Sequence, residues 1–153
     1  MATGQFNIAK GRFNELARRV ELGDPATCGL LISLYKTVEA EATLKTRTTK
    51  ALVDANNALC DFTNFSEQFL VNVQMALVAD QVQCFSDNVT WAFAGTSGVG
   101  VNNTVDTAVI YYVEDIGNIA TYNVPLGYYT VGVTTTGINL VIDVPPSGLY
   151  IDG

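Results

Sequence analysis

The second part of the chain constrains the fold most strongly, because short β-forming runs alternate there with clusters of turn residues. Runs rich in β-branched and aromatic side chains occupy Val89–Phe93, Ala108–Val113, Tyr128–Val133 and Leu140–Val144. Glycine, asparagine, threonine and proline fill the segments between these runs, as expected for tight turns. Several short strands at this spacing are typical of an antiparallel β-sandwich or a barrel-like sheet.

Two earlier apolar runs also predict strands. Cys28–Val38 is short and rich in β-forming residues, which favours a buried strand over a helix. Gln68–Val78 mixes alternation with continuous apolar stretches, so we predict a single strand there and keep a helix as the alternative. With the later runs, these segments make the chain predominantly β.

One amphipathic helix is predicted over Ile8–Leu22. Its apolar positions recur at i, i+3, i+4 and i+7 and therefore share one face. Asn7 is suited to cap the start of this helix, and Gly23 followed by Asp24-Pro25 marks its end. The apolar face consists of Phe13, Leu16, Ala17 and Val20.

A second, short helix is predicted from Thr48 or Thr49 to Asn56, with the threonine as its cap. The expected fold class is α+β and β-dominated: an N-terminal amphipathic helix and a short second helix accompany an antiparallel β-sandwich or barrel-like sheet. We find no internal repeat and no linker long enough to divide the chain. The sequence predicts one domain over 1–153, with a helical, mixed-charge portion at 1–60 and an acidic β portion at 61–153 that has no Lys or Arg.

The composition is low in charge. Of the 153 residues, 48% are apolar and 15% are charged, whereas about a quarter charged is usual for a globular domain. Much of the surface must therefore be neutral. Two explanations are open: extensive contact between subunits, or a β-surface rich in threonine and asparagine.

The charges are also polarised along the chain. All eight Lys and Arg residues lie in the first fifty positions with five acidic residues, which gives that portion a net charge of +3. The remainder contains ten acids and no Lys or Arg, a net charge of −10. Such a chain suits docking of its first part on a protein partner, while the rest repels nucleic acid and anionic membranes. The candidate partner-binding residues are Arg12, Arg18, Arg19, Lys45, Arg47 and Lys50.

Targeting and metal signals are lacking in the sequence. The N-terminal residues form no signal-peptide core, and no apolar segment reaches the ~18 residues of a membrane span. We therefore expect a soluble protein that is made in a cytoplasm and has no membrane partner. Cys28, Cys60 and Cys84 are too widely spaced to indicate a disulfide framework or a zinc site, so we expect buried apolar roles and no cofactor.

The chain contains no histidine, which removes Ser/His/Asp and Cys/His nucleophilic arrangements and histidine metal ligands. Carboxylate pairs are the remaining candidates for chemistry, namely Glu39 with Glu41 and Glu114 with Asp115. Two carboxylates about 5–9.5 Å apart can cleave glycosides, and a pair can bind calcium, although neither pair has calcium-loop spacing. Solvated turns are the favoured interpretation, and we expect no enzymatic activity.

Two further patterns allow a binding role. The glycine-rich segment Gly95–Gly100 lacks the GK[ST] ending of a phosphate loop, which favours a hairpin loop. A cluster of exposed aromatics could stack on sugar rings in a glycan-binding module, although core and subunit-interface positions are favoured. The aromatics concerned are Trp91, Tyr111, Tyr112, Tyr122, Tyr128 and Tyr129.

Several segments of the sequence resemble those of one group of proteins. They read FNIAKGR at 6–12, NELARRVELGDPA at 14–26, GLLISLYK at 29–36, EAEATL at 39–44, FTNF at 62–65, TAVIYYVEDIG at 107–117 and NVPLGYYTVGVTTTGINLVIDVPPSGLY at 123–150. In these segments, which cover most of its length, the chain resembles small structural proteins encoded in the structural gene clusters of tailed bacteriophages. The segment at 39–44 corresponds there to a short helix.

This resemblance implies a virion structural protein without enzymatic activity. We expect a capsid decoration or cement protein on the head that binds where major capsid protein subunits meet, as a homo-oligomer with a trimer favoured. A head-to-tail connector or minor tail component, bound to other virion proteins, is the alternative. A glycan-binding adhesion module and a carboxylate glycosidase are less favoured. The expected location is the virion, after assembly in the host cytoplasm.

Overall fold

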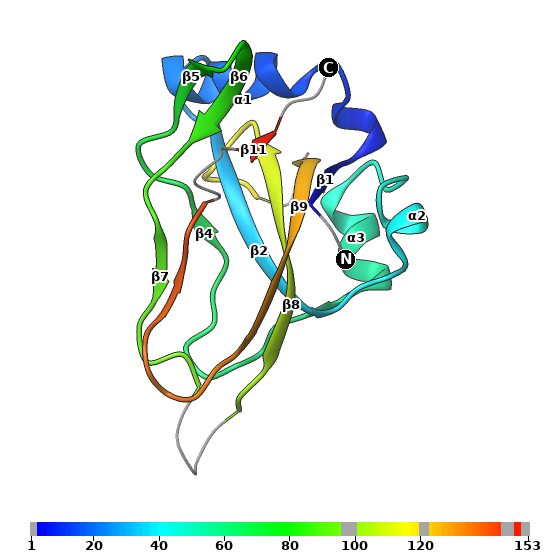
Figure 1. Cartoon of the computed structure of the whole chain (residues 1–153), viewed down its shortest axis with the longest axis vertical. Coiled ribbons are helices and arrows are strands. Elements are labelled where there is room, and N and C mark those ends of the chain that lie inside the picture. The colour runs from blue at the N-terminus through cyan, green and yellow to red at the C-terminus, as the bar shows by residue number, and fades with distance from the viewer. Residues whose placement is uncertain (1–2, 96–100, 120–122, 145–148, 151–153) are drawn as a thin grey trace.

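A computed structural model describes residues 3–95, 101–119, 123–144 and 149–150 (Figure 1). Antiparallel strands dominate, and a few short helices lie outside the sheets, which confirms the predicted α+β, β-dominated class. Of the glycine-rich motif Gly95–Gly100, only Gly95 is among the described residues, so the predicted hairpin loop lies outside them.

The largest sheet has the strand order β1-β9-β8-β2-β3, and β4 also pairs with β2. Every pairing in it is antiparallel. Leu31 of β2 lies opposite Tyr111 of β8, and Ser33 lies opposite Val109. Because side chains alternate along a strand, odd-numbered residues of β2 share one face with Tyr111. The strands are β1 Gly4–Gln5, β2 Gly29–Thr37, β3 Ala58–Leu59, β4 Gln68–Phe69, β8 Thr104–Val113 and β9 Asn123–Thr134.

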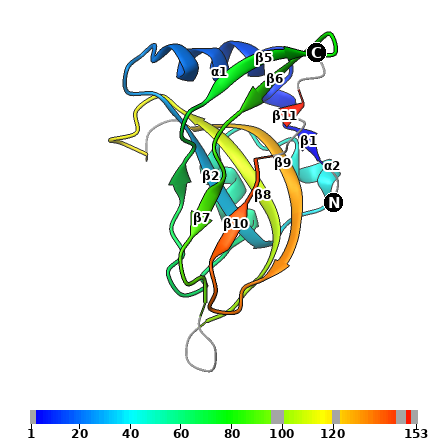
Figure 2. The ribbon, with the colours of Figure 1, turned by 60° about the vertical axis from the view of Figure 1, so that its left-hand side comes forward.

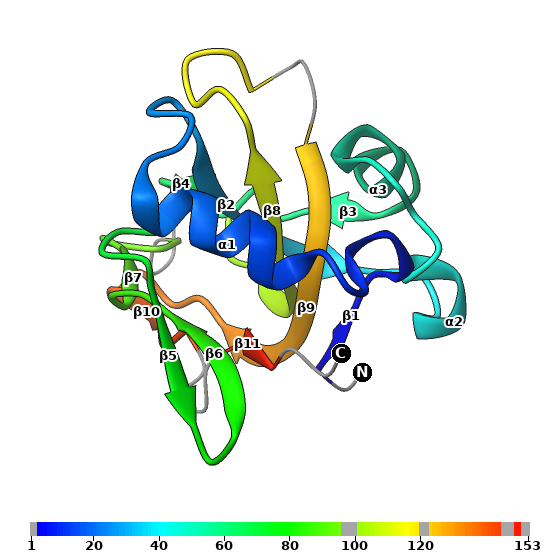
Figure 3. The same cartoon turned by 90° about the horizontal axis from the view of Figure 1, so that it is seen from above.

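Two smaller sheets accompany the large one. Strands β7 (Val89–Trp91) and β10 (Leu140–Ile142) pair with each other to one side of the large sheet (Figures 1 and 2). Strands β5 (Gln74–Val78) and β6 (Gln81–Phe85) form a hairpin, and β11 (Leu149–Tyr150) pairs with β6. The hairpin extends away from the body when the molecule is seen from above (Figure 3).

The first helix begins later than the sequence pattern predicts. Helix α1 spans Phe13–Leu22, and Asn7–Ala9 forms a separate 3-10 helix η1. Gly11 between them has a φ of 76°, a left-handed conformation that interrupts a continuous helix. The residue before α1 is Arg12, which makes no side-chain cap, so the predicted capping role of Asn7 is wrong.

The end and the buried face of α1 agree with the prediction. Gly23 has a φ of 64° and its N–H bonds to carbonyls of the last turn, as glycine does at helix ends. Phe13, Leu16 and Ala17 are buried, and Val20 is half-buried against the same core. Helix α1 packs on β2 and on the β5–β6 hairpin, so its apolar spacing determines which face meets the sheets.

Two short helices lie in the segment between β2 and β3. Helix α2 spans Glu41–Leu44, and α3 spans Lys50–Asn56. The Thr49 side chain accepts the N–H of Leu52 at 3.3 Å, which confirms the predicted threonine cap. Figure 1 shows both helices on the same side of the large sheet.

The prediction of a single strand over Gln68–Val78 is wrong. The segment forms β4 and β5, which belong to different sheets. Asn72 lies between them with a φ of 55°, and asparagine tolerates this left-handed conformation better than most residues. The apolar pattern continues through the break, so it does not reveal that the chain changes sheets there.

The core is rich in aromatic side chains, and five of the six aromatics considered for sugar stacking belong to it. Trp91 is 1% exposed and donates its indole N–H to the Ser66 carbonyl at 2.7 Å. Tyr111, Tyr112, Tyr128 and Tyr129 are also buried, which leaves Tyr122 outside the described residues. The free thiols of Cys60 and Cys84 are buried as predicted, whereas Cys28 is only half-buried.

Candidate functional site

The apolar strand β2 carries two polar side chains to one face of the large sheet. Ser33 and Tyr35 are two residues apart and therefore point the same way, and Tyr111 of β8 shares that face. All three residues are fully buried. Buried hydroxyls are costly unless they are hydrogen-bonded, so this face needs polar partners from another part of the chain.

Helix α3 supplies two of these partners. Lys50 is its first residue, and Asp54 lies one turn later on the same side. A lysine at the start of a helix meets the positive end of the helix dipole, which is unfavourable. Carboxylates in the folded protein therefore account for the position of Lys50, rather than helix propensity.

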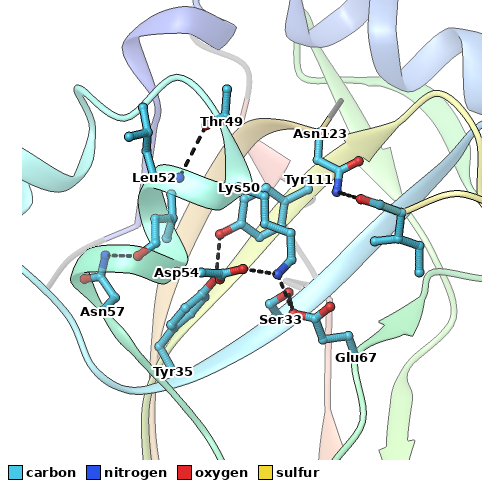
Figure 4. A network of polar contacts seen from close by, with 12 residues as sticks. Ser33, Tyr35, Thr49, Lys50, Leu52, Asp54, Asn57, Glu67, Tyr111 and Asn123 are labelled. Atoms are coloured by element: carbon cyan, nitrogen blue, oxygen red, sulfur yellow. Dashed lines mark hydrogen bonds and ion pairs between the residues drawn. The ribbon is translucent and has the colours of Figure 1, made fainter. Parts of the chain in front are cut away.

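The Lys50 ammonium group joins two carboxylates from different elements (Figure 4). Its Nζ lies 2.6 Å from Asp54 Oδ2 and 2.7 Å from Glu67 Oε1. Glu67, just before β4, also accepts the Ser33 hydroxyl at 2.9 Å. Lys50 is only 9% exposed, so these contacts replace water around the ammonium group.

Two tyrosines extend the contacts into the sheet. Tyr35 Oη donates to Asp54 Oδ1 at 2.6 Å and lies 2.7 Å from Tyr111 Oη. Because the Tyr35 proton is directed at the carboxylate, Tyr111 is the donor in the phenol pair. Burial raises the pKa of both phenols well above the ordinary value, so both are neutral. We call Ser33, Tyr35, Lys50, Asp54, Glu67 and Tyr111 the Lys50 network.

The Lys50 network is suited to holding the fold together rather than to catalysis. Its hydroxyl and ammonium donors face acceptors inside the network. General acid–base catalysis needs such a group within reach of a bound substrate. Three surface hollows of about 330, 530 and 440 Å³ are lined by other residues. The network therefore attaches α3 to the large sheet.

The sequence predicts Lys50 as a docking residue and does not predict the rest of the network. Two signals were present in the sequence. Lys50 and Asp54 have the i, i+4 spacing of a helical ion pair. Ser33 and Tyr35 interrupt an otherwise apolar run, and a polar residue in a buried strand needs a partner. Neither signal identifies Glu67, which is distant in sequence.

Three of the predicted docking residues lie on or beside α1 and are exposed. Arg12 precedes the helix, and Arg18 and Arg19 lie within it. Arg19 bonds to Glu15 at 3.0 Å, and Arg18 lies 3.9 Å from Glu21. Both arginine side chains stay largely exposed, at 65% for Arg18 and 45% for Arg19. These ion pairs are of the solvent-exposed kind that contributes little to stability.

The other three predicted docking residues flank α2 and α3. Lys45 follows α2 and is half-buried. Arg47 forms a two-pronged ion pair with Glu39, with Nε 2.9 Å from Oε2, and this contact lowers the pKa of Glu39. Lys50 is enclosed in its network and cannot reach a partner while the network is intact.

The two candidate carboxylate pairs are placed differently. Glu39 bonds to Arg47, whereas the Glu41 carboxylate accepts the Tyr128 hydroxyl at 2.7 Å. Glu114 and Asp115 are exposed, and Asp115 accepts the N–H of Gly117 at 2.9 Å within a turn. Each carboxylate of the first pair is held by a different internal partner, which is a structural arrangement rather than an acid–base pair.

The described residues contain neither a metal-binding cluster of side chains nor a membrane-spanning helix. Within the described ranges, no group of three or more histidine, cysteine, aspartate or glutamate side chains is placed to hold a metal ion. No helix in the same ranges combines the length and apolarity needed to cross a membrane. Comparison of the chain with protein families, curated proteins and solved structures gave no match.

Proposed function

We propose that the chain is a non-enzymatic virion structural protein of a tailed bacteriophage, a capsid decoration protein that binds the major capsid protein lattice. The observation that carries the proposal is the separation of its exposed charges. Exposed arginines lie on and beside α1, while the chain after residue 50 has ten acids, most of the described ones in loops and turns, and no Lys or Arg. The part of the chain up to residue 50 is thus suited to meet a charged protein surface, and the acidic remainder is suited to face solvent.

The internal contacts support a binding role over a catalytic one. Asp54, Glu67 and Lys50 hold α3 on the sheet, and Glu39 holds Arg47. The exposed basic side chains are left for a partner, and we assign docking to Arg12, Arg18 and Arg19 with Lys45 at the rim. A capsid lattice offers many identical sites, and charge complementarity orients and speeds association with each of them.

The proposal is tested by binding to capsids that lack this protein. We expect Arg19→Glu and Arg12→Glu to lower occupancy, and rising salt to weaken binding of the unchanged protein, because exposed charges are screened beyond about 8 Å at physiological ionic strength. Asp143→Lys, a reversal at an exposed residue of the acidic remainder, is the matched control and should leave occupancy unchanged. Occupancy that is insensitive to salt and to both arginine changes would contradict docking by charge.

The alternative position in the particle is the head-to-tail connector or the tail. A connector would form a single ring, whereas a decoration protein would repeat over the capsid lattice. Electron microscopy of intact particles, with a count of copies per virion, distinguishes the two. Absence of the chain from purified virions would refute both positions.

A further inference from the structure

The β5–β6 hairpin extends from the body (Figure 3), and several of its apolar side chains are exposed. Leu77 is 70% exposed, and Val82 opposite it is 37% exposed. The turn consists of Ala79 and Asp80, with φ of 49° and 64°. Two successive left-handed residues define the tight turn that matches the natural twist of a hairpin, so the arm has a defined shape.

One face of the hairpin forms a continuous apolar stripe. Leu77 pairs with Val82 and Met75 pairs with Cys84, so these four side chains share a face. At the base, Cys84 is buried and Met75 is half-buried, whereas Leu77 and Val82 nearer the tip are exposed. We call these four residues the hairpin stripe. It begins in the core and continues uncovered beyond it.

β11 pairs with the base of β6, but the part of the hairpin near its tip lacks the usual protection of exposed β structure. Natural proteins shield such segments with charged residues or proline. Apart from the Cys84 thiol, β5 and β6 contain no ionisable side chain, and Asp80 in the turn supplies the single charge of the hairpin. The stripe is therefore suited to be covered by another apolar surface.

We propose that the hairpin stripe is covered by the same stripe of a second copy of this chain, packed about a two-fold axis at Leu77. A two-fold contact joins the same surface of both copies, and an apolar stripe complements itself in this way. Asp80 and Gln74 each lie three residues from Leu77, in opposite directions. An antiparallel arrangement therefore places Asp80 of one copy over the base of the other hairpin.

A basic side chain is available at that base. The Glu21 carboxylate accepts the N–H of Met75 at 3.1 Å, and Arg18 lies 3.9 Å from Glu21. The Arg18 side chain is 65% exposed and can reach an incoming carboxylate. Each end of the interface then gains an ion pair between Asp80 of one copy and Arg18 of the other. This complementarity selects a second copy, and the antiparallel orientation, as the occupant.

This inference goes beyond the proposed function, because self-association of the hairpin requires no capsid. The test is the molar mass of the free protein measured by light scattering and sedimentation over a range of concentrations. We expect a dimer that Leu77→Asp weakens by at least about tenfold in dissociation constant, because a carboxylate would be buried in the stripe. Ile138→Asp, at a position 72% exposed outside the hairpin, is the control and should leave the dimer intact.

A charge swap tests the orientation of the two copies. Asp80→Arg and Arg18→Asp should each weaken the dimer, and the double variant should restore it, because the ion pair is rebuilt with reversed signs. Circular dichroism and thermal unfolding show whether each variant is folded. A monomeric or trimeric unchanged protein, equal effects of the Leu77 and Ile138 changes, or failure of the swap in folded variants would each overturn the proposal.

Discussion

At the scale of single residues, the ammonium group of Lys50 is held by two carboxylates and stands over an aromatic ring. Its Nζ lies 5.6 Å from the centre of the Tyr111 ring, in addition to its contacts with Asp54 and Glu67. Removing one partner of a buried ion pair leaves the other charge buried and unpaired. This loss of stability is larger than the stability that the intact pair contributes. The stability of α3 on the sheet therefore depends on this lysine.

We predict that Lys50→Met lowers the free energy of unfolding by about 3–5 kcal/mol, since Asp54 and Glu67 would lose their shared cation. Urea unfolding measures the change. Lys36→Met is the matched control: Lys36 pairs with Asp61 at 2.8 Å, but both side chains are substantially exposed, so its loss should cost about 0–1 kcal/mol. Equal effects of the two substitutions would show that Lys50 is solvated in the folded protein.

At the scale of elements, α1 is held by the apolar face that its spacing predicts. Leu16 is 3% exposed in the middle of that face, with Phe13 and Ala17 beside it. We predict that Leu16→Ala lowers the free energy of unfolding by about 2–5 kcal/mol, because it removes buried atoms and leaves a cavity. Asn14→Ala, on the exposed side of the same helix, should change it by less than about 0.5 kcal/mol. A small effect at Leu16 would mean that the core closes around the shorter side chain.

At the scale of the whole molecule, the distribution of basic residues determines where trypsin can cut. No Lys or Arg follows Lys50, so unfolded protein must leave residues 51–153 as one fragment. In the folded protein, Lys50 is enclosed at the start of α3, whereas Arg12 and Arg18 are exposed. We predict early cleavage of the native protein near α1 and protection at Lys50. Mass spectrometry of samples taken over time measures the order in which the fragments are released. Rapid native release of the fragment beginning at Ala51 would show that α3 detaches readily from the sheet.

The sequence by itself determined the elements whose signals are local. The run from Cys28 predicts β2, the i, i+3, i+4 spacing predicts the buried face of α1, and Thr49 predicts the start of α3. In each case, neighbouring residues contain the physical cause: side-chain alternation, helical periodicity or a cap. The start of α1 was missed because Gly11 interrupts a pattern that continues apolar on both sides of it.

Only the tertiary structure decided which distant residues meet. The run at Gln68–Val78 divides between two sheets, since its two halves find different partner strands. Lys50 belongs to the interior because Glu67, far along the chain, lies 2.7 Å from its ammonium group. A buried ammonium group needs a carboxylate close to it in the folded protein. Lys50 would be a surface residue if Glu67 lay elsewhere. The sequence gives the number of charged residues, but the fold determines which of them are exposed and which are paired inside the protein.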